Sequence, residues 1–250
     1  MDLFNTNPLS VEQRDSFLRD GFLKVEAIIS PEEVLYLKEV YEAFLSGQID
    51  DQGLRSDLSG FNNEVGQERI VQIMRPSLLK EDLNQISYRQ RALDYARQLL
   101  GEDMDFDFDM LIDKPPYSNS PTPWHQDEAY WIDMPDKRAV SCWLALDESV
   151  KENGCMWFIP TEDEEGIREH QQLREGGALS CVASEDEGVA IELKPGSCTF
   201  HSGRTLHYAR GNSTSLRRRA FILNFRPKAM IEYERERGFN HLGNRELKQT

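Results

Sequence analysis

From residue 105 onward the chain is a succession of short runs of β-forming residues, and this pattern constrains the fold more than any other feature. Pairs that contain Gly or Pro separate many of the runs, at Asn153-Gly154, Pro195-Gly196, Ser202-Gly203 and Gly211-Asn212. Short strands with tight turns are typical of β-barrels and double-sheet jelly rolls, whereas a βαβ fold needs a helix between successive strands. We therefore expect a barrel or jelly roll whose strands cover 105–110, 139–146, 155–159, 189–193, 198–201, 206–209 and 219–225.

The first 104 residues carry helix signals instead. Ser10 with Gln13 and Ser30 with Glu33 have the capping-box spacing that starts a helix. The expected elements are helices from 11, 31 and 88 that end near Gly21, Gly47 and Gly101, a short strand over 69–74 and a mobile loop over 48–66. The predicted fold class is therefore mainly β with flanking α-helices.

Composition narrows the function classes. A chain of 250 residues suits one β-rich domain, and its formal net charge of −15 disfavours binding to nucleic acid or an anionic membrane. No apolar run approaches the roughly 18 residues of a membrane span, and residues 1–10 lack the basic and apolar parts of a signal peptide. We expect a cytoplasmic protein with four free, mostly buried thiols, at Cys142, Cys155, Cys181 and Cys198.

His125 and Asp127 are two residues apart, the spacing with which one extended strand aims both side chains at one point. A His-x-Asp triplet alone is weak evidence, but a histidine from a distant strand would complete a two-histidine, one-carboxylate face that suits Fe(II). His201 and His207 compete for that role. Spacing alone does not choose between them, because either could equally bond a loop carbonyl.

Three consecutive arginines precede the apolar run over 220–223. Strand alternation places Arg218 on the face opposite Arg217 and Arg219. An arginine that points into a β-barrel needs a carboxylate partner, because an unpaired buried charge is very costly. The distal carboxylate of a 2-oxoacid is one candidate.

At these residues the chain resembles the phytanoyl-CoA dioxygenase family of Fe(II)/2-oxoglutarate-dependent oxygenases. The resemblance covers roughly residues 105 to 226, with weaker similarity in the N-terminal helices. The matching segments are Met110 to Pro116, Trp124 to Asp127, Ala139 to Asp147, Glu152 to Met156 with Pro160, Phe200-His201, Leu206-His207, Asn212 and Arg218. Several motifs in the same order are more specific than any one of them. The resemblance implies a double-stranded β-helix, which is a cupin-like jelly roll with the metal inside one mouth.

The resemblance assigns roles residue by residue. It makes His125, Asp127 and His207 the iron ligands, and it places His201 at a position that recurs in the family without binding metal. It makes Arg218 the anchor of the 2-oxoglutarate carboxylate. The positions expected to line the co-substrate pocket are Met110, Trp143 and, more loosely, Gln72.

Two departures from the family pattern are visible. Thr161-Glu162-Asp163 follows Pro160 where the family often has Gly-Ser-His, and Ala209 stands where some members have a hydroxyl. The first leaves the loop conformation and the substrate open. Trp124, Tyr130 and Trp131 could wall a substrate pocket or simply pack in a core.

The resemblance thus implies a dioxygenase that uses Fe(II), O2 and 2-oxoglutarate to hydroxylate an unactivated C–H of a small-molecule metabolite, with release of succinate and CO2. A CoA ester is not favoured, because its phosphates would need a basic patch. The alternatives are a non-catalytic jelly-roll binding protein and a cupin-like metalloenzyme that does not use 2-oxoglutarate. We expect a single domain over 1–250, with a helical N-terminal part over 1–104, a jelly-roll core over 105–226 and a C-terminal tail or lid over 227–250.

Overall fold

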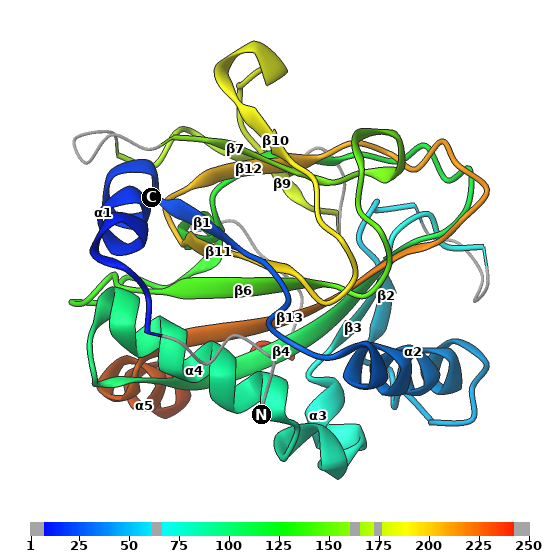
Figure 1. Cartoon of the computed structure of the whole chain (residues 1–250), viewed down its shortest axis with the longest axis horizontal. Coiled ribbons are helices and arrows are strands. Elements are labelled where there is room, and N and C mark those ends of the chain that lie inside the picture. The colour runs from blue at the N-terminus through cyan, green and yellow to red at the C-terminus, as the bar shows by residue number, and fades with distance from the viewer. Residues whose placement is uncertain (1–7, 62–66, 161–165, 173–176, 243–250) are drawn as a thin grey trace.

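Two antiparallel sheets face each other in the computed structural model, which describes residues 8–61, 67–160, 166–172 and 177–242. The larger sheet has seven strands in the order β1-β11-β6-β13-β4-β3-β2, and the smaller has four in the order β10-β7-β12-β5. The smaller sheet lies above the larger one in Figure 1, and most helices lie on the far side of the larger sheet. The predicted fold class, a mainly β jelly roll with flanking helices, is confirmed.

The strand bounds agree with the sequence pattern over most of the core. The larger sheet contains β1 Phe22–Val25, β2 Arg55–Asp57, β3 Val71–Met74, β4 Met104–Lys114, β6 Val140–Ala145, β11 Cys198–Ser202 and β13 Arg218–Pro227. The smaller sheet contains β5 Thr122–His125, β7 Met156–Ile159, β10 Val189–Ile191 and β12 Leu206–Ala209. A separate hairpin pairs β8 Gln171–Gln172 with β9 Leu179–Ser180.

Five α-helices in the described part of the chain accompany the sheets, and most of them cover the outer face of the larger sheet. They are α1 Val11–Asp20, α2 Pro31–Leu45, the short α3 Pro76–Leu79, α4 Ser87–Leu100 and α5 Lys228–Glu236. Both predicted capping boxes form, at Ser10 and at Ser30, where each side chain accepts a hydrogen bond from the backbone N–H three residues later. No helix within the described ranges is long and apolar enough to cross a membrane.

The expectation that the first third is helical is wrong for two segments. β1 is a strand that pairs with the edge of β11. β2 lies within the range predicted as a mobile loop, 48–66, but it is a strand that pairs with β3. Both strands are only three or four residues long. Such short segments carry little periodicity of their own, and they become strands because an exposed sheet edge offers them hydrogen-bond partners.

Alternation along β13 divides the core into two layers. Phe221 and Phe225 point toward the helices and pack in a cluster with residues of α2 and α4. Ala220 and Ile222 point the other way, into a cluster that joins the two sheets and includes Trp143. β13 lies between β4 and β6, so its inward residues reach the centre of the space between the sheets.

The segment after Pro227, expected as a tail or lid, begins with the helix α5, and a buried ion-pair network links this helix to β4. Arg226 Nε lies 3.0 Å from Asp107 Oδ2, and its Nη1 lies 3.3 Å from Glu234 Oε1. Arg235 and His241 contact the same two carboxylates. Because two arginines already neutralise this acidic pair, we interpret the cluster as a structural network rather than a metal site.

Candidate metal centre

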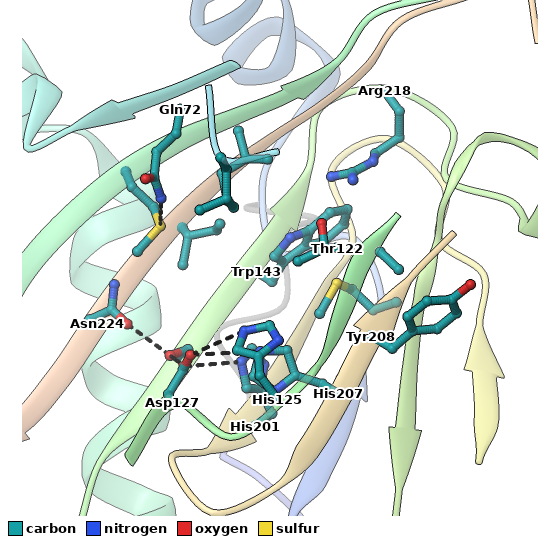
Figure 2. A pocket seen from close by; sticks show the side chains of 17 residues that line it. Gln72, Thr122, His125, Asp127, Trp143, His201, His207, Tyr208, Arg218 and Asn224 are labelled. Atoms are coloured by element: carbon teal, nitrogen blue, oxygen red, sulfur yellow. Dashed lines mark hydrogen bonds and ion pairs between the residues drawn. The ribbon is translucent and has the colours of Figure 1, made fainter. Parts of the chain in front are cut away.

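Three predicted ligands meet at one end of the space between the sheets. His125 is the last residue of β5, and it lies opposite His207 of β12 in the strand register. The Nε2 atoms of these histidines lie 3.8 and 3.7 Å from Asp127 Oδ1 (Figure 2). The assumption that one extended strand carries both His125 and Asp127 is wrong, because β5 ends at His125 and Asp127 begins a 3-10 turn, Asp127–Tyr130.

The donor set fits a divalent cation. Ligand atoms of His125, Asp127 and His207 all lie within 4.8 Å of one another. Each imidazole Nδ1 bonds a backbone carbonyl two residues earlier, at 2.8 Å to Pro123 and 2.9 Å to Thr205. Each Nδ1 therefore carries the proton, and each Nε2 turns its lone pair toward the carboxylate. Two imidazoles and one carboxylate leave positions open for further ligands, as suits Fe(II).

The charge states also suit metal binding. Burial alone would raise the pKa of Asp127, but the neighbouring imidazoles in their protonated form, His207 first and then His201 and His125, lower it far below its usual range. Burial, and then repulsion from His125, holds the pKa of His207 well below its ordinary value. An ionised carboxylate and neutral imidazoles are the forms that bind a metal ion.

Arg218 lies at the other end of the same cavity (Figure 2). Its side chain is 1% exposed, and its Nε and Nη1 have no hydrogen-bond partner among the described residues. Arg217 pairs with Asp113 and Arg219 pairs with Asp147, as the alternation predicted for side chains on the opposite face. Burial lowers the pKa of Arg218 to about 10, so it remains a cation at neutral pH. A buried cation with free donors calls for an anionic ligand.

Three further predicted residues line this cavity. Met110 and Trp143 contribute inward side chains of β4 and β6, and the Arg218 guanidinium lies 5.1 Å from the Trp143 ring centre. Gln72 of β3 also lines it and donates from Nε2 to Met110 Sδ over 3.4 Å. Ala209 is there too, without the hydroxyl that some family members have.

The three aromatic residues considered for the substrate wall are not among the described residues that line this cavity. Trp124 is not among the lining residues, but it stacks on Tyr208, which does line the cavity, with ring centres 5.0 Å apart. Trp131 lies under the Arg226 guanidinium, 3.9 Å from its ring centre. Tyr130 is edge-on to His125, and its hydroxyl accepts a hydrogen bond from the Leu179 backbone. A role of these three aromatic residues in substrate binding stays a prediction. The departure at 161–163 lies outside the described residues.

Sequence reasoning missed Ser141 and Asn224, which both line the cavity beside Asp127. Ser141 Oγ lies 3.1 Å from Asp127 Oδ2 and 2.8 Å from Asn224 Oδ1. The signal was available in strand alternation, because Ser141 precedes Trp143 by two positions and Asn224 continues the inward series that starts at Arg218.

A jelly roll with a two-histidine, one-carboxylate face and an unpaired arginine in the same cavity defines a class, the Fe(II)/2-oxoglutarate-dependent oxygenases. A family model described as Phytanoyl-CoA dioxygenase (PhyH) matches residues 17–220. The chain belongs to this family, and it is an Fe(II)/2-oxoglutarate-dependent dioxygenase.

Individual relatives span most of the chain. A probable alpha-ketoglutarate-dependent hypophosphite dioxygenase of Stutzerimonas stutzeri is 26% identical over 226 residues, which are 86% of this chain and 77% of the relative. The peroxisomal phytanoyl-CoA dioxygenase of Bos taurus is 24% identical over 232 residues, 88% of this chain and 69% of the relative. The crystal structure of EvdO2 from Micromonospora carbonacea var. aurantiaca has a TM-score of 0.76 at 28% identity, covering 89% of this chain and 93% of that one. A second EvdO2 structure contains 2-oxoglutarate and has a TM-score of 0.75.

Proposed function

We propose that the protein hydroxylates an unactivated C–H bond of a small-molecule metabolite. In the balanced reaction, substrate, O2 and 2-oxoglutarate give hydroxylated substrate, succinate and CO2. His125, Asp127 and His207 hold the iron, and Arg218 holds the far carboxylate of 2-oxoglutarate. The observation that carries this proposal is that the three-ligand face and the unpaired arginine open into one cavity.

The side chains have separate tasks in this reaction. Bound Fe(II) with 2-oxoglutarate supplies the activation of O2, which no side chain can perform. Arg218 fixes the co-substrate through charge-assisted hydrogen bonds, and Trp143 and Met110 form the walls along which it lies. The hydrogen bonds from the two imidazoles to backbone carbonyls hold the rings in the orientation that metal binding requires. The largely apolar lining excludes water from the reacting atoms.

The cavity chemistry supports an uncharged substrate. Among the described residues that line it, Arg218 is the single lysine or arginine, and the proposed role commits it to 2-oxoglutarate. Gln72 and Asn224 offer carboxamides that can bind neutral polar groups. A CoA ester remains disfavoured, since its phosphates would meet a chain of net charge −15. We propose on the same grounds that neither nucleic acid nor a membrane is a partner.

We also propose that the 250 residues act as one domain in the cytoplasm. The family match extends from 17 to 220, through both the helical part and the jelly-roll core. All four cysteines are buried free thiols, a state that a reducing compartment maintains.

Anaerobic titration tests the function directly. Fe(II) and then 2-oxoglutarate are added to the protein, and the visible charge-transfer absorption of the iron–2-oxoglutarate chelate is followed. We expect the band with wild-type protein and its loss in His207→Ala. Succinate release is then screened against neutral metabolites, with hypophosphite and a CoA ester included as anionic candidates. Absence of the band together with absence of succinate would contradict the proposal, and turnover of an anionic candidate would contradict the substrate class.

A further inference from the structure

The two carboxylate oxygens of Asp127 have different neighbours. Oδ1 faces the Nε2 atoms of His125 and His207, the predicted iron ligands. Oδ2 faces Ser141 Oγ at 3.1 Å. It also faces His201 Nε2 at 3.7 Å (Figure 2). The side chain therefore presents one oxygen to the metal centre while the other is engaged by groups that are not predicted to bind metal.

Strand register places the groups around Oδ2 in one row. Ser141 on β6 lies opposite His201 on β11 and opposite Asn224 on β13. All three side chains are buried, at 4%, 2% and 8% exposure. The row spans three neighbouring strands of the larger sheet, so its position is set by the sheet and not by a loop.

Proton counting shows how the row can hold Asp127. A serine hydroxyl donates a single hydrogen, so Ser141 cannot donate to both Asp127 Oδ2 and Asn224 Oδ1. If the Asn224 side-chain amide is rotated by about 180°, its oxygen and nitrogen exchange places. The nitrogen then donates to Ser141 Oγ, and the serine proton is available for Asp127 Oδ2. The rotation gives up one weak hydrogen bond, from Asn224 Nδ2 to the Phe108 carbonyl over 3.4 Å.

We propose that Ser141 is a positioning residue that donates to Asp127 Oδ2 and is itself oriented by Asn224, with His201 as the second neighbour of that oxygen. The inference rests on the proposed iron site. Its consequence is that Asp127 offers Oδ1 alone to the metal. A carboxylate that bound through both oxygens would occupy one more coordination position, and that position is needed for the co-substrate or O2.

Co(II) binding without 2-oxoglutarate tests the proposal through a signal that does not depend on turnover. The visible spectrum of Co(II) reports both its affinity and its coordination number. Ser141→Ala should weaken Co(II) binding about ten- to a hundred-fold and change the spectrum, while Ser141→Thr should stay within about threefold of wild type. Ser149→Ala is the matched control, because Ser149 is fully buried and its hydroxyl has no hydrogen-bond partner among the described residues. It should bind Co(II) as wild type does.

A double-mutant comparison tests the relay through Asn224. Asn224→Ala should weaken Co(II) binding in the wild-type background but have little further effect when it is combined with Ser141→Ala. The effects of two substitutions within one hydrogen-bond network are not additive. Additive effects, or wild-type affinity and spectrum in Ser141→Ala, would overturn the inference and leave the iron site standing. If Ser141→Ala does not fold, unchanged binding in Asn224→Ala overturns it. A wild-type protein that binds no Co(II) would overturn the iron site as well.

Discussion

At the scale of single residues, the site depends on how each imidazole is held. The Nδ1 atoms of His125 and His207 both bond the carbonyl of the residue two positions earlier. This local tether orients each ring without help from a distant side chain. His201 has no such bond, and its buried Nδ1 lacks any hydrogen-bond partner among the described residues. Two contacts therefore distinguish His207 from His201. His207 Nδ1 bonds a backbone carbonyl, and His207 faces Asp127 Oδ1 whereas His201 faces Oδ2.

The ligand assignment makes a direct prediction. His125→Ala, Asp127→Ala and His207→Ala should each lose bound iron and all iron-dependent succinate release, because each removes one of three donors. His201→Ala should keep iron, with weakened affinity. Iron content is measured after anaerobic loading and desalting. Loss of iron in His201→Ala together with its retention in His207→Ala would show that the assignment is wrong.

Arg218 allows a second test at this scale. Arg218→Ala should raise the 2-oxoglutarate concentration needed for half-maximal chelate formation about ten- to a hundred-fold, since a shielded charge-assisted contact contributes about 1.5–3 kcal/mol. Arg217→Ala and Arg219→Ala are the matched controls, because their guanidinium groups pair with Asp113 and Asp147 on the other face. Equal effects from all three substitutions would mean that the co-substrate lies on a different face of β13.

At the scale of elements, β4 carries buried charge on the face that meets the helices. Asp109 is 1% exposed, and its Oδ1 accepts a hydrogen bond from Ser77 of α3. Burial raises the pKa of Asp109 from 3.8 to about 6, although Ser77 and the nearby Arg89 and Arg75 oppose the shift. Because the folded protein binds this proton more tightly than the unfolded chain, the group favours folding below about pH 4. That contribution is lost as the pH rises through about 6.

Asp109→Asn should remove this pH dependence while keeping an acceptor for Ser77. Between about pH 4 and pH 8, the free energy of unfolding of wild type should fall relative to the variant by up to about 3 kcal/mol. Urea unfolding of both proteins at several pH values measures the difference. A difference that stays constant across this range would contradict the assigned pKa and the sign of the effect.

At the scale of the whole molecule, the site joins the two sheets. His125 and His207 belong to the smaller sheet, and Arg218 belongs to the larger one. A metal ion with 2-oxoglutarate would therefore connect elements of both sheets and add to the side-chain packing of the central cluster. Ligands that bind only this assembled state stabilise it against unfolding.

Thermal unfolding tests that coupling. Mn(II), which does not react as Fe(II) does, should raise the Tm when added with 2-oxoglutarate. At about 100 times the Kd the gain is about 2.7 kcal/mol, or roughly 5–10 °C for a chain of this size. His207→Ala should show almost no shift with the same additions. An equal shift in that variant would place the binding site elsewhere.

The sequence by itself determined the features that depend on local pattern. Turn pairs and short β-forming runs predict a barrel or a jelly roll, and a period of two along β13 separates Arg218 from Arg217 and Arg219. Capping boxes predict where α1 and α2 begin. The triad needed more than spacing, because neither His201 nor His207 is favoured by its local sequence, and the family resemblance made that choice.

Only the tertiary structure decided the features that depend on which strands are neighbours. β1 exists as a strand because the edge of β11 is free to pair with it. Asp127 reaches the histidines through a 3-10 turn, so the His-x-Asp spacing suggested the right residues for the wrong geometric reason. Ser141 stands beside Asn224 because β6 and β13 are adjacent in one register, 83 positions apart in the chain. Such contacts are fixed by nonlocal hydrogen bonding between strands, and no local pattern records them.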